Sequence, residues 1–141
     1  MKDTEHLQRF ITAQEGVYER AFAEVKNGKK VSHWMWFIFP QMKGLGFSET
    51  ARYYGIENRA EAEAYLNHPA LSKRLKEITH ILLDTNETDA TKVFGYPDNM
   101  KLKSSMTLFA NLPSAPPVFR QVLDQFFNGE EDDKTISLLN D

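Results

Sequence analysis

Glycine and proline residues interrupt this chain at short intervals, and their spacing limits the folds that it can adopt. The sequence holds seven glycines and six prolines in 141 residues. Between them, apolar residues recur at every third or fourth position, which is the period of an amphipathic helix. The alternation of apolar and polar residues that predicts a half-buried strand extends over no useful length. We therefore expect an all-α fold.

The helical pattern and its end signals divide the chain into unequal pieces. The first runs from Leu7 to Val25 and ends near Gly28, because glycine suits the left-handed exit of a helix. The next, Trp34–Phe39, is too short for periodicity to distinguish a strand from two helical turns. Further helices are expected over 49–54, 58–66, 69–82, 90–93, 97–109, 117–127 and 134–139. The prediction is a single domain spanning residues 1–141, with seven to nine mostly short helices that do not form a simple four-helix bundle.

Composition excludes several classes of function. The formal net charge of −3 disfavours a broad, non-specific grip on nucleic acid or on an anionic membrane. The absence of cysteine removes thiolate catalysis, cysteine-based zinc sites and iron–sulfur clusters, and it suits a reducing cytoplasm. The longest apolar run, Trp34–Phe39, is far shorter than the ~20 residues that span a bilayer. We expect a cytoplasmic protein with no cofactor, no membrane contact and no nucleic-acid partner.

The most unusual segment is Ser32–Gln41, with the sequence SHWMWFIFPQ. Trp34 and Trp36 carry large flat faces that could stack a planar ligand, while His33 and Gln41 could supply directional hydrogen bonds. The alternative is that both indoles belong to the core. A metal role for His33 is not expected, because the other histidines show no ligand spacing to it.

A glycine-containing loop follows this segment. Gly44 and Gly46 precede a predicted helix start, where free backbone N–H groups favour an anion. Ser48 could cap that helix or donate to a phosphate. The loop lacks the spacing of a Walker motif or a dinucleotide fingerprint, so a plain flexible turn is the alternative.

A third candidate region is the helix that contains Lys101, Lys103, Ser104 and Ser105. Two ammonium groups and two hydroxyls could face an anionic ligand, or they could form a solvated helix face. Ser105 shares the apolar stripe, so it is expected to bond a backbone carbonyl or to line a cavity. A serine nucleophile with Lys101 as its base is geometrically conceivable, but it fits no established motif.

Two further polar residues lie on apolar helix faces. Arg74 is either an anion contact or a structural partner of Glu77, three residues on. Gln14 falls on the first apolar stripe and is interpreted as an amide bonded to nearby backbone. Asn58 and Asp132 are expected to cap helices.

Several of these segments together resemble one bacterial family. They are Ser32–Gln41, Gly44–Ser48, Ala62–Pro69 with Arg74–Leu75, Phe94–Gly95 with Asp98, Lys101–Phe109 and Asp133–Thr135. The family is a domain of unknown function whose members are often labelled "calpastatin". The resemblance implies a single-domain, all-helical fold without an established activity. The label does not fit this composition, because calpain inhibitors of that name are disordered chains and 12% aromatic residues indicate a packed core.

A fainter similarity links the chain to the NADAR group, which acts on ADP-ribose-linked compounds. The shared feature is only the order of elements: an aromatic segment ending in glutamine, a helix rich in Glu and Ala, and a lysine-containing helix ending in Phe. It transfers no catalytic residue.

The function predicted from the sequence is a pocket for a planar metabolite that carries phosphate, of the nucleotide or ADP-ribose kind. The chemistry expected at such a pocket is metal-independent hydrolysis or glycosyl-bond cleavage. The alternative is a non-catalytic protein-interaction or regulatory module. The residues assigned to the ligand are His33, Trp34, Trp36, Gln41, Gly44, Gly46, Ser48, Arg74, Lys101, Lys103, Ser104 and Ser105.

Overall fold

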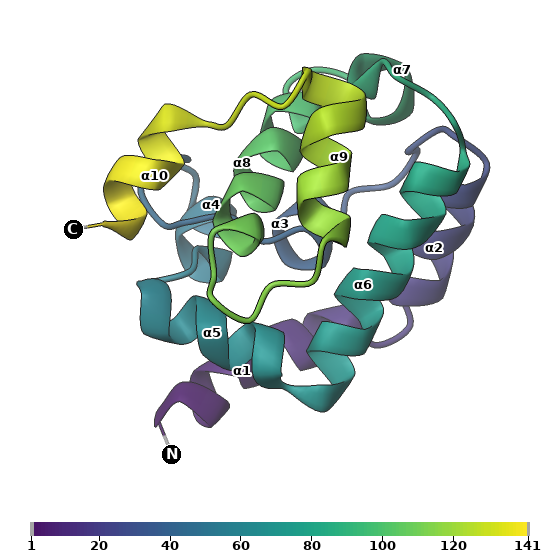
Figure 1. Cartoon of the computed structure of the whole chain (residues 1–141). Coiled ribbons are helices and arrows are strands. Elements are labelled where there is room, and N and C mark those ends of the chain that lie inside the picture. The colour runs from purple at the N-terminus through teal and green to yellow at the C-terminus, as the bar shows by residue number, and fades with distance from the viewer. Residues whose placement is uncertain (1, 141) are drawn as a thin grey trace.

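Ten helices form the part of the chain that this computed structural model describes, which is residues 2–140, with side chains described from residue 6 onward (Figure 1). They are α1 (Lys2–Gln14), α2 (Tyr18–Lys26), α3 (Met35–Ile38), α4 (Glu49–Tyr54), α5 (Arg59–Asn67), α6 (Pro69–Asp84), α7 (Ala90–Phe94), α8 (Asp98–Ala110), α9 (Val118–Phe127) and α10 (Asp133–Leu139). The all-α prediction is confirmed, and within these residues the only β-type pairing is an isolated bridge between Met42 and Ile56. No helix described here is both long and apolar enough to cross a membrane.

The prediction of one continuous helix from Leu7 to Val25 is wrong. Helix α1 ends at Gln14 and α2 begins at Tyr18, with Gly16 between them at φ +73°. Glycine adopts this left-handed conformation without steric cost, so the chain can turn there. The break raises the number of helices to ten, and Trp34–Phe39 contributes the short helix α3 and not a strand.

Helix α8 lies at the centre of the fold. It packs against α5, α7, α9 and α10, and Figure 1 shows it surrounded by other helices. Leu102 and all residues from Ser104 to Phe109 are buried. A helix that is covered on every side shows little amphipathic pattern, and α8 accordingly carries buried serine and threonine among its apolar residues.

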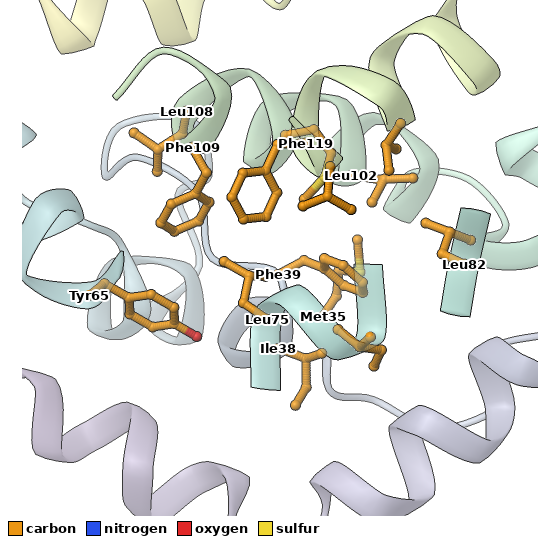
Figure 2. Close-up of a cluster of buried hydrophobic side chains, with 14 of the residues drawn as sticks. Met35, Ile38, Phe39, Tyr65, Leu75, Leu82, Leu102, Leu108, Phe109 and Phe119 are labelled. Atoms are coloured by element: carbon orange, nitrogen blue, oxygen red, sulfur yellow. The ribbon is translucent and has the colours of Figure 1, made fainter. Parts of the chain in front are cut away.

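Aromatic side chains connect four helices through the core. The ring of Tyr65 on α5 lies 5.1 Å from Phe10 on α1 and 5.4 Å from Phe109 on α8, measured between centroids. Phe109 in turn lies 5.7 Å from Phe119 on α9. Figure 2 shows Tyr65, Phe109 and Phe119 among the buried side chains of this cluster. These separations suit edge-to-face and tilted aromatic packing.

The expected helix caps are present. Asn58 Oδ1 accepts a hydrogen bond from the Glu61 amide at 2.9 Å, and Asp132 Oδ2 accepts one from Thr135 at 3.0 Å. The start of α6 was not predicted in this detail: His68 Nδ1 accepts from the amides of Ala70 and Leu71. Each cap satisfies N–H groups that a helix start leaves unpaired.

Candidate functional site

An open groove of about 570 Å³ lies between α3 and α4, and we call it the Trp36 groove. It is lined by Trp36, Phe37, Glu49, Thr50, Tyr53 and Tyr54. Tyr53 is 60% exposed, and its ring packs edge-on against Tyr54 with 4.8 Å between centroids. Exposed aromatic faces beside a hollow can stack a planar ring. Among the residues assigned to a ligand from the sequence, Trp36 lines this groove.

Two lysines share one carboxylate beside Trp36. Lys30 Nζ lies 2.8 Å from Asp98 Oδ2, and Lys101 Nζ lies 3.4 Å from Asp98 Oδ1. Lys101 Nζ also lies 4.9 Å from the centre of the Trp36 ring, a cation–π distance. Two ammonium groups and one carboxylate leave one positive charge in excess. The Lys30–Asp98–Lys101 cluster is therefore a local exception in an acidic chain, and it would attract an anion.

The two tryptophans have different roles. Trp34 was expected to offer a stacking face or to belong to the core, and it is 0% exposed. Its ring packs against Phe39 and Phe94, with centroids 6.2 and 6.4 Å away, and Lys30 Nζ lies 5.1 Å from the ring centre. No face is left for a ligand, so the ligand-binding assignment of Trp34 is corrected to a core position.

Glu24 holds the turn that leads into α3. Its carboxylate accepts hydrogen bonds from the amides of Val31 at 2.8 Å and Ser32 at 3.0 Å, and from Trp34 Nε1 at 2.9 Å. Partial burial acts to raise the pKa of this carboxyl, but the hydrogen bonds from Ser32, Val31 and Trp34 outweigh it and lower the pKa to about 2. The indole N–H of Trp34 is thus already used within the fold.

Lys103 lies on the other side of α8 from Lys101. A step of two residues along a helix rotates the side-chain direction by about 200°, so Lys101 and Lys103 face opposite sides of α8. Lys103 Nζ lies 3.6 Å from Glu130 Oε1 and 6.0 Å from the Phe127 ring centre. The structure therefore does not bring the two lysines together at one site.

The two serines of α8 also differ. Ser104 is 8% exposed, and its hydroxyl donates to the carbonyl of Met100 at 3.2 Å. Ser105 is fully buried one turn after Lys101, and its hydroxyl has no hydrogen-bond partner among the described residues. The expected bond from Ser105 to a backbone carbonyl is not formed, and its role in lining a cavity stays a prediction.

The residues of the glycine loop shape the turn into α4. Ser48 Oγ accepts from the Ala51 amide at 3.1 Å, so it caps the helix. A Cβ on Gly46 would lie 2.8 Å from Ala51 Cβ, which explains why this position has no side chain. Gly44 has φ +106° and lies against Leu138 of α10.

His33 and Gln41 lie on either side of α3. His33 is exposed and Gln41 is half-buried. The backbone carbonyl of Gln41 accepts from the amide of Ile56 at 2.9 Å, which ties the end of the Trp34–Phe39 segment to the residue after α4. Their side chains as ligand contacts stay predictions.

Arg74 belongs to a separate buried network. Arg74 Nη1 donates to Gln14 Oε1 at 3.1 Å, and Gln14 Nε2 donates to the carbonyl of Phe37 at 2.8 Å and to the Tyr65 hydroxyl at 3.1 Å. The interpretation of Gln14 as an amide bonded to backbone is confirmed. Burial raises the pKa of Tyr65, so its hydroxyl stays protonated. Arg74 thereby joins α6 to α1 and α3 and is not part of the lysine cluster.

The expected pairing of Arg74 with Glu77 is replaced by a tyrosine contact. The Tyr18 hydroxyl donates to Glu77 Oε1 at 3.0 Å and lies 3.1 Å from the carbonyl oxygen of Arg74. Burial and the bond to Glu77 raise the pKa of Tyr18. These contacts connect α2 to α6.

Arg9 anchors the end of α4, and sequence reasoning missed it. Its guanidinium donates to the carbonyls of Tyr53 at 2.8 Å and Gly55 at 3.0 Å, and to that of His6. It also pairs with both carboxylate oxygens of Glu61, at 3.0 and 3.2 Å. All five N–H donors of the guanidinium are then engaged. The Arg9 and Glu61 side chains are only 8% and 4% exposed.

The charge of Glu61 is maintained in spite of this burial. Burial alone would raise the pKa of the carboxyl, but Arg9, the amide of Glu57 and His6 lower it below its usual range. Because Tyr53 and Tyr54 line the Trp36 groove, the Arg9–Glu61 pair fixes one wall of it. In the part of the chain that is described, no three His, Asp or Glu side chains are grouped to hold a metal ion.

The architecture defines the class of protein: a compact all-α domain with one aromatic groove next to a lysine cluster. The chain belongs to the family of proteins of unknown function DUF1810, whose model matches residues 4–139. It is 44% identical to the conserved hypothetical protein Rv1873 from Mycobacterium tuberculosis, and the crystal structure of that protein superimposes with a TM-score of 0.93 over 96% of each chain. No match was found among curated proteins. The assignment to a bacterial family of unknown function is confirmed.

Replacement of Glu24 by Gln is expected to make the protein less stable by about 1–2 kcal/mol at neutral pH. The loss is limited because solvent screens this partly exposed carboxylate. The pKa of Glu24 is about 2 in the fold and 4.5 ordinarily, so its stabilisation is complete above pH 4.5 and is lost as the pH falls toward 2. Urea unfolding from pH 7 down to pH 2.5 would show the two proteins converging. Glu19→Gln, an exposed change on the same helix, is the control. If the wild type and Glu24→Gln differed in stability by the same amount at every pH, the low pKa assigned to Glu24 would be contradicted.

Replacement of Arg9 by Lys keeps the charge but removes the forked set of donors. We expect a loss of about 2 kcal/mol of stability and faster amide exchange over residues 49–55, while α8 and α9 keep their protection. Hydrogen exchange followed by mass spectrometry measures this directly. Arg120→Lys is the matched control, because its pair with Glu131 is much more exposed, at 43% and 31%. Uniform loss of protection across the chain would show that Arg9 has no specific effect on α4.

Proposed function

We propose that this protein binds a planar metabolite carrying phosphate, of the nucleotide or ADP-ribose class, with its ring in the Trp36 groove and its phosphate at Lys101. The observation that supports this most is the contact between the two features. Lys101 Nζ lies 4.9 Å from the centre of the Trp36 ring, which itself lines the groove. A ligand with a ring joined to an anion would engage both.

The lysine cluster is arranged so that one lysine is available. Lys30 is 8% exposed and makes the shorter contact with Asp98, at 2.8 Å, whereas Lys101 is 25% exposed at 3.4 Å. If Lys101 turns toward a phosphate, Asp98 keeps its partner Lys30. The partly buried carboxylate of Asp98 therefore keeps a partner. Leaving it unpaired would cost stability.

The order of elements that suggested the NADAR group supports an ADP-ribose-like ligand. The aromatic segment forms α3, the Glu- and Ala-rich segment forms α5, and the lysine-containing segment forms α8. His33 and Gln41 flank α3, and we retain them as hydrogen-bonding groups of the proposed site. Trp34, Arg74 and Lys103 are left out, because each has its own partners in the fold.

Binding of AMP, ADP-ribose and NAD by calorimetry tests the proposal. Lys101→Met should weaken binding about tenfold, the value of one hydrogen bond to a charged group. Trp36→Leu should weaken it by a similar or larger factor through lost stacking. Lys103→Met is the matched control and should bind like the wild type, because Lys103 lies on the far side of α8 and pairs with Glu130.

The proposal fails if none of these ligands raises the melting temperature of the wild-type protein. That outcome would favour the second candidate, a protein-interaction module. Val31, Tyr96 and Met100 are 74%, 80% and 46% exposed, and each lies within two residues of Lys30 or Asp98. Exposed apolar side chains grouped in this way are typical of a protein-contact surface.

We extend the proposal to metal-independent hydrolysis of the bound ligand, because Glu49 is a carboxylate that lines the same groove. It could accept a proton from a water whose oxygen attacks the ligand, while the bond to the leaving group breaks and that group takes up a proton from solvent. Glu49→Gln should then stop the release of products, which chromatography measures. Its affinity for the ligand should stay within about twofold of the wild-type value. Unchanged turnover in this variant would remove Glu49 from the reaction, and absence of turnover in the wild type would identify a binding protein.

A further inference from the structure

A second groove adjoins the Trp36 groove and shares a wall with it. It has a volume of about 410 Å³ and lies between α1 and the end of α4. Tyr53 and Tyr54 line both grooves. The other lining residues are His6, Gln8, Arg9, Thr12 and Ala13. We call this hollow the Thr12 groove. A ligand long enough to pass the exposed ring of Tyr53 would enter it from the Trp36 groove.

The Thr12 groove offers neutral hydrogen-bonding groups. Gln8 and Thr12 are four residues apart on α1, so their side chains lie on one face, and both are exposed. Gln8 Nε2 donates to Thr12 Oγ1 at 3.1 Å. This bond uses one amide N–H and leaves the Gln8 carbonyl oxygen, its second N–H and the Thr12 hydroxyl proton for a ligand.

The charged groups of the Thr12 groove are already committed. Arg9 has all five N–H donors engaged with backbone carbonyls and Glu61, so it has none for a phosphate. His6 Nδ1 contacts Glu61 Oε2 at 3.0 Å. The two ends of the combined site thus differ in chemistry. The Lys101 end carries excess positive charge, and the Thr12 end carries neutral donors and acceptors.

We infer that the two grooves form one site for a nucleotide, with the phosphate at Lys101, the base in the Trp36 groove against Tyr53 and the edge of the base bonded to Gln8 and Thr12. This inference rests on the proposed function and adds the part of the ligand that is recognised. A carboxamide presents a donor beside an acceptor, and nucleobase edges present the complementary pair. Gln8 and Thr12 are then the residues that determine specificity.

The test compares AMP, GMP, CMP, UMP and ribose 5-phosphate on the wild type, Gln8→Leu and Thr12→Val. The wild type should bind its preferred nucleotide about tenfold more tightly than the least preferred one, the discrimination expected from one amide–base pair. In Gln8→Leu this preference should disappear, while affinity for ribose 5-phosphate stays unchanged. Thr12→Val should reduce the preference by a smaller factor. Gln121→Leu, an exposed glutamine on α9, is the control and should behave as the wild type.

The outcomes separate this inference from the proposed function. If nucleotides bind and Lys101→Met weakens them, but Gln8→Leu leaves the base preference intact, the inference is overturned and the Trp36 site stands. If ribose 5-phosphate binds as tightly as every nucleotide, the base is not recognised and the inference is likewise overturned. If no nucleotide binds, the proposed function fails, and the inference fails with it.

Discussion

The burial of α8 on all sides is the constraint on which the rest of the structure depends. A helix with Leu102 and residues 104–109 all buried can be accommodated only if other helices surround it. Helices α5, α7, α9 and α10 supply that cover. The first turn of α8 is where the helix emerges from its cover, and Asp98 and Lys101 lie there, next to Lys30 and Trp36. The charge of the candidate site is thus placed by the packing of the core.

Polar side chains fix the path of the backbone around the groove. Glu24 holds the turn before α3, and Gln14 donates to the carbonyl of Phe37 within α3. Arg9 donates to the carbonyls at the end of α4. Each of these bonds is made to backbone, so each sets the path of the chain. A short helix buries too little apolar surface to hold itself in place, and α4 has no buried residue at all. The groove therefore depends on a few directional contacts.

The fold could be predicted from the sequence because its signals are local. Apolar spacing and caps such as Asn58 and Asp132 located most helices. The break at Gly16 escaped notice because apolar residues keep their spacing on both sides of it. The site was harder to predict, since its contacts join residues far apart in the chain. Lys30 pairs with Asp98, and nothing in the sequence around Lys30 or around Asp98 indicates that the two residues meet. Trp34 and Trp36 are identical in type, and only the contacts of Trp34 with Glu24, Phe39 and Phe94, which the sequence does not reveal, make it the core residue.

The two ends of the segment from Gln41 to Ile56 are joined by hydrogen bonds between backbone groups. Ile56 donates to the carbonyl of Gln41, and Lys43 donates to the carbonyl of Ile56, both at 2.9 Å. Gly55 lets the two chain segments approach each other, because a Cβ there would lie 2.7 Å from Lys43 Cα. Everything between these points, including α4 and the tyrosines of the groove, therefore leaves and re-enters the framework at one place. A substitution within this segment can therefore change what the groove accepts, while the other helices keep the same entry and exit points.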